Sequence, residues 1–393
     1  MSDTSRKTAI LVIEDGTVAE GFSEGTPGTT FGELVFNTSM TGYQEIYTDP
    51  SYAGQVVMLT YPLIGNYGAT DEDLESRRPF VRGVAMRELC NRPGSWRRRY
   101  SLTDFLNRFG IVGISGIDTR ALTRRVRSFG AMRCGITTEY STAEMIEKVK
   151  QSPEISGQDL VAEVTTQEAY KFDFTPNPEE DQRDFPEKKW DFHIALIDTG
   201  TKINIPKSLV RRGCRVTVVP AHEKAADILS RRPDGVMISN GPGDPKDSPY
   251  VVDTVRELLG RLPVMGVCLG HQMVSLALGA DTYKLKFGHR GANQPVKDLE
   301  RNRVVVTSQN HGYAVSADGL EKLGARVSHV NVNDGTVEGV AHESHPLISV
   351  QFHPEASPGP MDSRYLFDEF LDLIDGWKKN GRAAPAPAGT GSN

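Results

Sequence analysis

Residues 262–280 place a cysteine between two glycines, at the point where a short apolar run changes to a helical pattern. The run Val264–Val267 predicts a buried strand, and the apolar residues beyond the cysteine recur at helical spacing. Gly266 and Gly270 flank Cys268 as in the strand–turn–helix elbow of Gly-x-Ser-x-Gly hydrolases, with sulfur in place of oxygen. A nucleophile in such a strained turn needs small neighbours, because strand and helix must approach closely there.

The expected position of Cys268 also suits nucleophilic chemistry. A thiol at a helix N-terminus lies at the positive end of the helix dipole, which favours the thiolate. Backbone N–H groups in the first turn can hold an oxyanion. An isolated cysteine is more often a buried structural residue. The flanking glycines and the strand-to-helix setting favour a nucleophile over that simpler interpretation.

The composition is ordinary for a globular chain, and 393 residues are enough for two or three domains. The net charge of -6 gives no electrostatic reason to expect nucleic-acid binding. The four cysteines, Cys90, Cys134, Cys214 and Cys268, show no CxxC spacing, so we expect neither a disulfide framework nor structural zinc. The sequence shows no signal-peptide pattern and no apolar stretch of membrane-spanning length, so we expect a cytoplasmic protein without a membrane partner.

The domain boundary is predicted from residues 171–190, which are polar and contain three prolines. We interpret them as a linker between a first domain over residues 1–170 and a second over residues 191–380. Residues 381–393 contain nothing to bury, and we expect a disordered tail there.

Predicted strands and helices alternate in the second domain, which indicates a doubly wound, mostly parallel sheet. Ligands of such sheets bind beyond the carboxyl ends of the strands, where Cys268 falls. The expected strands are 192–198, 215–220, 235–239, 303–308, 325–331, 337–342 and 347–352, and the expected helices are 203–212, 221–231, 250–259 and 361–377.

The first half predicts an α/β domain as well. Residues 38–52 are polar and interrupted by Gly and Pro, so we predict a long loop there. Its three tyrosines argue against disorder, and ordered loops of this length are often functional. The expected strands of this half are 8–13, 31–37, 56–60 and 83–88, and the expected helices are 102–108 and 120–126.

A thiol nucleophile needs a base, and all nine histidines lie at or beyond His193. Pro354 biases His353 toward an extended backbone, in which residues i and i+2 project to the same side. We therefore predict that His353 and Glu355 face one site as base and orienting carboxylate. Spacing alone leaves other candidates for the base, namely His271, His289, His311 and His345. His342 and His345 have no metal-site motif around them, so we predict no metal centre.

A glycine loop follows the expected strand 235–239, with Gly241 and Gly243 on either side of a proline. It is either an ordinary turn or a backbone donor for the oxyanion, since glycine allows a close approach. The chain contains neither GxxxxGK[ST] nor GxGxxG, so we expect it to hold no cofactor. If the product requires ATP, that chemistry is expected on another chain.

Two arginine-rich segments stand out in the first half: the run Arg97–Arg99 and the cluster Arg120, Arg124, Arg125 and Arg127. The simpler interpretation is a solvated face. The alternative is a docking surface for a protein partner, because Arg is enriched at interfaces.

With Cys268, the glycine loop and His353–Glu355 in place, the second half resembles a class I glutamine amidotransferase domain. The first half is similar to the small chain of carbamoyl-phosphate synthetase. The resemblance runs from about residue 8 to residue 376 and is carried by the segments 36–45, 48–52, 60–66, 116–120, 286–289 and 351–360. It implies an N-terminal domain that docks the large chain, completes the glutamine pocket and precedes the amidotransferase domain.

The resemblance also implies residue roles. Cys268 would form a glutamyl thioester, His353 would transfer protons, and Glu355 would orient the ring. Leu269 and Gly243 resemble the oxyanion donors. The implied glutamine-binding positions are Ser51, Gly241, Gly243, Leu269, Gln272, Asn310, Gly312 and Tyr313. The small chain would pass ammonia to a separate large chain, as a heterodimer or a higher oligomer. That partner would use ATP, Mg and bicarbonate to make carbamoyl phosphate for pyrimidine and arginine biosynthesis.

One departure from the family pattern is Thr199, which stands where an aromatic residue is expected and could loosen the packing near the passage for ammonia. Three other functions stay open at this stage. The chain could be an amidotransferase for another acceptor, a non-catalytic partner that regulates a synthetase, or a stand-alone cysteine hydrolase. The first domain argues against the other acceptor, the intact Cys-His-Glu set against the non-catalytic partner, and the extra domain against the stand-alone hydrolase.

Overall fold

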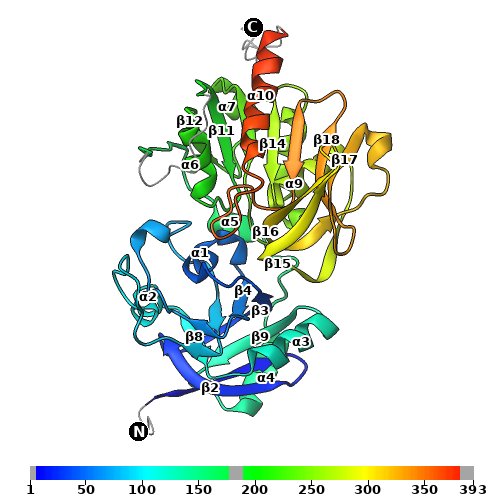
Figure 1. Ribbon diagram of the computed structural model, residues 1–393. Coiled ribbons are helices and arrows are strands. Elements are labelled where there is room, and N and C mark those ends of the chain that lie inside the picture. The colour runs from blue at the N-terminus through cyan, green and yellow to red at the C-terminus, as the bar shows by residue number, and fades with distance from the viewer. Residues whose placement is uncertain (1–5, 177–188, 381–393) are drawn as a thin grey trace, which may run out of the picture.

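The computed structural model describes residues 6–176 and 189–380, which form two sheet-based halves (Figure 1). The first, blue to cyan in Figure 1, contains a closed barrel, and the second, green to red, contains a large twisted sheet. The predicted tail 381–393 and residues 177–188 of the predicted linker lie outside the described residues. Among the described residues, none of the helices has the length and apolar character needed to cross a membrane.

The barrel closes through seven strands, in the order β1-β2-β8-β6-β4-β3-β9. Side chains alternate between its two sides, as the strand period of two requires. Leu11, Leu34 and Ile136 belong to one buried cluster, whereas the neighbouring Val12 packs with Met145 and Val149 instead. The strands are β1 Thr8–Ile13, β2 Val18–Gly25, β3 Thr29–Asn37, β4 Gln55–Leu59, β6 Gly83–Ala85, β8 Val112–Ser115 and β9 Met132–Thr137.

Helices and short segments surround this barrel. The helices are α1 Tyr43–Thr48, α2 Leu102–Arg108, α3 Thr119–Phe129 and α4 Thr142–Gln151, with 3-10 turns η1 Pro50–Tyr52 and η2 Asp71–Asp73 and a small sheet of β5 Leu63–Ile64 and β7 Glu88–Leu89. Helix α5 Leu160–Val164 lies at the junction instead, with Val161 in a buried cluster of the second sheet. Helices α2 and α4 each begin with a capping box, Ser101 with Asp104 and Ser141 with Glu144.

The second sheet has a parallel core flanked by antiparallel strands. Strands β12, β11, β13, β14 and β19 run parallel in that order, and the remaining pairings are antiparallel. The strands are β10 Tyr170–Lys171, β11 His193–Asp198, β12 Arg215–Pro220, β13 Gly235–Ile238, β14 Val264–Val267, β15 Thr282–Asp298, β16 Arg303–Val315, β17 Ala325–Asn331, β18 Val337–His342 and β19 Leu347–Val350.

Helices cover both faces of the parallel core, so the sheet is doubly wound as predicted. Helices α6 Asn204–Arg211 and α10 Tyr365–Lys379 share one buried cluster with the sheet. Helices α7 Ala225–Ser230, α8 Pro249–Leu258 and α9 Leu269–Leu278 share the cluster on the opposite face. The short 3-10 turns η3 Pro245–Asp247 and η4 Leu320–Leu323 complete this half.

The predicted loop over residues 38–52 is wrong, because it contains helix α1 and the turn η1. Its apolar residues Tyr43, Ile46 and Tyr47 recur at helical spacing and are buried. The surrounding polar residues and glycines obscured that short pattern in the sequence.

The long hairpin of β15 and β16 brings the two halves together beside β3 (Figure 1). The sequence pattern predicted neither β15 nor the second half of β16. Both contain polar residues that are buried and contact the first half, such as Arg290 and Asn310. Near the predicted boundary, β10 pairs with β12 and so extends the second sheet.

Candidate active site

Cys268 occupies the predicted elbow between β14 and α9, with φ 54 and ψ −104. Such a backbone conformation is strained for a residue with a side chain, and strain of this kind concentrates at functional sites. A Cβ atom on Gly266 would lie 2.7 Å from the backbone of Gly270, and one on Gly270 would lie 2.3 Å from the carbonyl oxygen of Ile238. The structure therefore shows why both positions flanking Cys268 require glycine.

The thiol of Cys268 is buried, with 1% of the residue exposed. Its Sγ lies 3.5 Å from the carbonyl oxygen of Asn310, to which it donates, and 3.8 Å from Nε2 of Gln351. The thiol thus lies at the carboxyl edge of the parallel strands, as the sequence predicted. Substrate must reach it through a pocket, because bulk solvent does not.

His353 and Glu355 face each other as predicted, with 2.6 Å between Nδ1 and Oε1. This contact holds the Nδ1–H toward the carboxylate, so the neutral ring presents the lone pair of Nε2. Nε2 makes no hydrogen bond among the residues that the structure describes. Lys202, buried just before α6, completes the row: its Nζ lies 3.1 Å from Oε1 of Glu355 and 2.5 Å from the carbonyl oxygen of Ala356.

Neighbouring charges shift the pKa values of His353 and Glu355 in the direction opposite to the shift that burial causes. Burial lowers the pKa of His353, but the neighbouring Glu355 and Cys268 outweigh it and raise that pKa to about 10. Burial likewise raises the pKa of Glu355, but Lys202 and His353 outweigh it and lower that pKa to about 2. The geometry therefore favours an ionised Glu355 beside an imidazole that readily takes a proton.

The other candidate bases have different partners. His311 lines the pocket, but its Nδ1 lies 2.8 Å from the carbonyl oxygen of Tyr313 and its Nε2 lies 3.2 Å from Oε1 of Gln309. His271 is buried against the hydroxyl of Ser349, at 2.9 Å, and burial lowers its pKa to about 3. His345 stacks on His342, with ring centroids 4.3 Å apart. Sequence spacing left His271, His289, His311 and His345 open as candidate bases. Only the three-dimensional geometry distinguishes His353 from them.

The glycine loop lies against the start of α9. A Cβ on Gly241 would meet the carbonyl oxygen of Thr199 at 2.1 Å, so this position also requires glycine. Thr199, the departure from the family pattern, is fully buried, and its hydroxyl lies 3.0 Å from the carbonyl oxygens of Ser239 and Asn240. The hydroxyl thus holds the glycine loop where an aromatic ring was expected.

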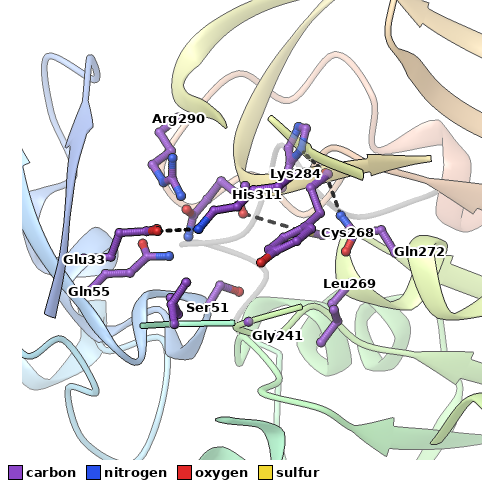
Figure 2. A pocket seen from close by; sticks show the side chains of 15 residues that line it. Glu33, Ser51, Gln55, Gly241, Cys268, Leu269, Gln272, Lys284, Arg290 and His311 are labelled. Carbon is purple, nitrogen blue, oxygen red and sulfur yellow. Dashed lines mark hydrogen bonds and ion pairs between the residues drawn. The ribbon is translucent and has the colours of Figure 1, made fainter. Parts of the chain in front are cut away.

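A pocket in front of Cys268 brings together every residue that the resemblance implied for glutamine binding (Figure 2). These residues are Ser51, Gly241, Gly243, Leu269, Gln272, Asn310, Gly312 and Tyr313. Ser51 enters from the first half and the others from the second. The pocket therefore lies at the junction of the two halves and is incomplete without either.

Three hydrogen bonds tie the halves together around the pocket. The Nδ2 atom of Asn240 donates to Oγ of Ser51 at 2.8 Å, and that of Asn310 donates to Oδ2 of Asp49 at 3.1 Å. The hydroxyls of Tyr313 and Ser156 lie 2.7 Å apart. These contacts fix the pocket walls relative to the nucleophile.

Further charged and polar residues also line the pocket. Glu33 and Gln55 face Lys284, Arg290 and His311 across it (Figure 2). Nζ of Lys284 pairs with Oε1 of Glu33 at 2.7 Å, while Nε of the buried Arg290 makes no hydrogen bond within the described chain. A pocket with both signs of charge suits a zwitterionic amino acid. Among them, the sequence had singled out only His311, as a candidate base. No sequence signal marked Glu33, Gln55, Lys284 or Arg290, because their place in the pocket depends on the packing of the barrel against the hairpin.

His289, His311 and Glu338 lie close enough to one another to hold a metal ion, with ligand atoms within 4.8 Å. Nε2 of His289 lies 2.8 Å from Oδ2 of Asp334, and Nδ1 lies 3.4 Å from Oε1 of Glu338. Burial lowers the pKa of His289, but the two carboxylates outweigh it and raise that pKa. Both ring nitrogens of His289 therefore already face an acidic side chain, Asp334 on one side and Glu338 on the other.

A strained cysteine elbow, an oriented imidazole and a polar pocket on a doubly wound sheet define a cysteine-dependent hydrolase of the α/β type. Comparison with known proteins agrees with that class. Residues 195–373 match the family "Glutamine amidotransferase class-I", and residues 11–136 match "Carbamoyl-phosphate synthase small chain, CPSase domain".

Relatives named carbamoyl phosphate synthase small chain align over nearly the whole chain. The protein of Syntrophotalea carbinolica is 49% identical, over 93% of this chain and 98% of its own. Those of Thermosynechococcus vestitus and Methanopyrus kandleri are each 50% identical, over 94% and 93% of this chain and 97% and 98% of their own. The chain therefore belongs to the carbamoyl-phosphate synthase small-chain family, and its second half is a class I glutamine amidotransferase domain.

Proposed function

We propose that this chain is the glutaminase subunit of a glutamine-dependent carbamoyl-phosphate synthetase. The observation that carries the proposal is that Cys268 lines a pocket formed by both halves and lies close enough to the His353–Glu355 pair to act on the charge of His353. The names of the relatives support carbamoyl phosphate as the product that receives the ammonia. The amidotransferase half alone would leave the acceptor open.

The reaction begins when Sγ of Cys268 attacks the side-chain carbonyl carbon of glutamine and His353 takes the thiol proton at Nε2. The carbonyl oxygen becomes an oxyanion, which the backbone N–H groups of Leu269 and Gly243 stabilise. His353 then gives its proton to the amide nitrogen, the C–N bond breaks, and ammonia leaves a glutamyl thioester on Cys268.

In the hydrolysis of the thioester, His353 acts again as a base and then as an acid. The ring takes a proton from water, whose oxygen attacks the thioester carbon. The C–S bond breaks, the thiolate regains the proton, and glutamate leaves. Glu355 stays ionised throughout and keeps the Nδ1–H of His353 in place.

The ammonia passes to a large chain, which binds ATP and Mg and makes carbamoyl phosphate from bicarbonate for pyrimidine and arginine biosynthesis. This proposal places the ATP chemistry in the partner and requires no cofactor in this chain. It also takes the pair to be at least a heterodimer in the cytoplasm.

The proposal is tested by measuring glutamate release from glutamine by the purified chain, alone and with a large chain of the same family, ATP and bicarbonate. We expect slow release that rises sharply with the partner, together with carbamoyl phosphate. Fast release that is indifferent to the partner would instead indicate a stand-alone hydrolase or another acceptor enzyme. Cys268→Ser is the control for contaminating glutaminase.

A further inference from the structure

Glu75 is a buried carboxylate at the junction of the two halves, with only 1% of the residue exposed. It follows the turn η2 in the first half and plays no part in the mechanism above. Its N–H donates to Oγ1 of Thr48 at 3.0 Å, which fixes it to helix α1. An unused carboxylate this deep in a protein needs a reason, because burying its charge is costly.

The partners of Glu75 lie at the start of α6 in the second half. The N–H of Ile203 donates to its carbonyl oxygen at 2.8 Å. The side-chain and backbone nitrogens of Asn204 donate to its carboxylate at 2.5 and 3.3 Å. These are the residues directly after Lys202. The carboxylate of Glu75 therefore approaches the catalytic half beside the buried ammonium group.

Lys202 pairs with Glu355 of its own half and stands two residues before Asn204, which binds the carboxylate of Glu75 from the other half. Glu355 is its closest carboxylate, at 3.1 Å, and Glu75 is another negative group that acts on its charge. Positive charge on Lys202 screens Glu355 and so weakens its attraction for a protonated His353. Negative charge on Glu75 offsets that screening. Through these two effects, the charge of Glu75 influences how strongly His353 binds its proton.

Other charged groups face the same region and also influence the protonation of Glu75 and Lys202. Glu45 on α1 and Glu355 act on Glu75, and Asp49 before η1 acts on Lys202. Burial raises the pKa of Glu75 to about 8, against the opposing effects of Lys202 and Asn204. Glu75 also lines a cavity with Arg77 and Asp198, which gives its proton a path for exchange.

We propose that Glu75 is a positioning residue for glutamine hydrolysis, which acts through Lys202 and Glu355 to set the basicity of His353. This inference deepens the proposed function and rests on it for its biological meaning. The arrangement makes the first half a contributor to the chemistry of the second, although it supplies no reacting atom. When Glu75 is ionised, Lys202 screens Glu355 less and His353 holds its proton more strongly.

The test is a histidine NMR titration of the full chain labelled at ¹³Cε1, with the His353 signal assigned by its loss in His353→Asn. We expect Glu75→Gln to lower the midpoint of the His353 titration by about half a pH unit or more, which is about a threefold change in the ratio of protonated to neutral His353. The alkaline limb of glutaminase kcat/KM should move to lower pH with it. At pH 6, where Glu75 is protonated, the two proteins should have activities within about twofold.

Glu72→Gln is the matched control, because Glu72 lies on the same segment but pairs with Arg99 at the surface. It should leave the His353 midpoint unchanged. An unchanged midpoint in folded Glu75→Gln, or an equal shift in both variants, would overturn the inference. If Glu75→Gln does not fold, Glu75→Asp is the second variant to test. The shorter side chain moves the negative charge away from Lys202, so the midpoint of the His353 titration should also fall, but by less.

The NMR readout needs neither glutamine nor the large chain. A shifted midpoint in a chain without glutaminase activity would therefore sustain the coupling and reject the proposed function. A glutaminase whose His353 midpoint ignores Glu75 would sustain the function and reject the coupling.

Discussion

The two halves contribute to the same pocket in different ways. The doubly wound sheet provides the groups that make and break bonds, Cys268 and His353, on backbone that is strained or tightly packed. The first half provides groups that hold and polarise the substrate, such as Ser51 on the turn η1 and Glu33 on strand β3. Reaction chemistry therefore depends on one half, while substrate retention and electrostatic tuning depend on their contact. Variants of the first kind should lower kcat, and variants of the second kind should mainly raise KM.

The largest effect is expected for Cys268→Ser. Loss of the thiol removes the covalent route, so glutamine-dependent synthesis by the assembled pair should fall about 10³-fold or more. Synthesis from added ammonia should stay near the wild-type rate, because the large chain is untouched. Loss of both activities would instead assign Cys268 a role in folding or assembly.

Glu355→Gln should lower kcat for glutamine hydrolysis by about 10²- to 10⁴-fold, because His353 loses the charge that orients it and favours its protonation. The variant also leaves Lys202 beside a neutral group, which should cost about 3 kcal/mol of unfolding free energy. Steady-state kinetics and urea unfolding at neutral pH measure the two effects. A variant with normal kcat would show that the contact of His353 with Glu355 is incidental.

The same pair predicts a pH dependence of stability. The pKa of Glu355 is lowered in the fold to about 2, so its contribution is present above the unfolded value of about 4.5 and is lost as pH falls toward 2. Wild type should therefore lose more unfolding free energy than Glu355→Gln between those pH values. Parallel losses in the two proteins would contradict the assignment.

Ser51→Ala tests the barrel side of the comparison. Its hydroxyl accepts from Asn240 at 2.8 Å and faces the pocket, so its loss should raise KM for glutamine about fivefold, equivalent to about 1 kcal/mol. The value of kcat should change less than about twofold. Ser128→Ala, on the exposed end of α3, is the matched control and should change neither. A fall in kcat without a change in KM would place Ser51 with the reacting groups.

The smallest effect is expected at the arginine cluster of α3. Arg124 is exposed, whereas Arg125 pairs with Asp15 at 2.5 Å, so only part of the cluster is available to a partner. Changing both to Gln should weaken association with the large chain about three- to tenfold, measured by titration at physiological ionic strength. Arg256→Gln, which removes another exposed pair, is the control. Unchanged affinity would favour the interpretation of the cluster as a solvated face without a partner.

The sequence predicted much of the second half because its signals are local. Strand, elbow and helix around Cys268 are contiguous, and His353 and Glu355 lie two residues apart. The doubly wound core follows from alternating strands and helices, and the structure confirms it.

The missing parts depend on contacts that are distant in the chain. The closed barrel could not be predicted, because its pairings join segments that are far apart in the chain, such as β1 with β9. The long strand β15 was missed because it contains many polar residues, some of which are buried at the junction with the barrel. Helix α1 was lost for a different reason, since only Tyr43, Ile46 and Tyr47 carry its pattern. Lys202 and Arg290 had no motif at all. Their neighbours are set by the fold and not by spacing.

The most direct test of the account is to trap the covalent intermediate. The chain is mixed with glutamine, quenched in acid after a short interval, digested and examined by mass spectrometry. The account predicts a glutamyl adduct on the peptide that contains Cys268, which hydroxylamine removes and Cys268→Ser lacks. Glutamate release without any adduct, continuing at the same rate in Cys268→Ser, would contradict it.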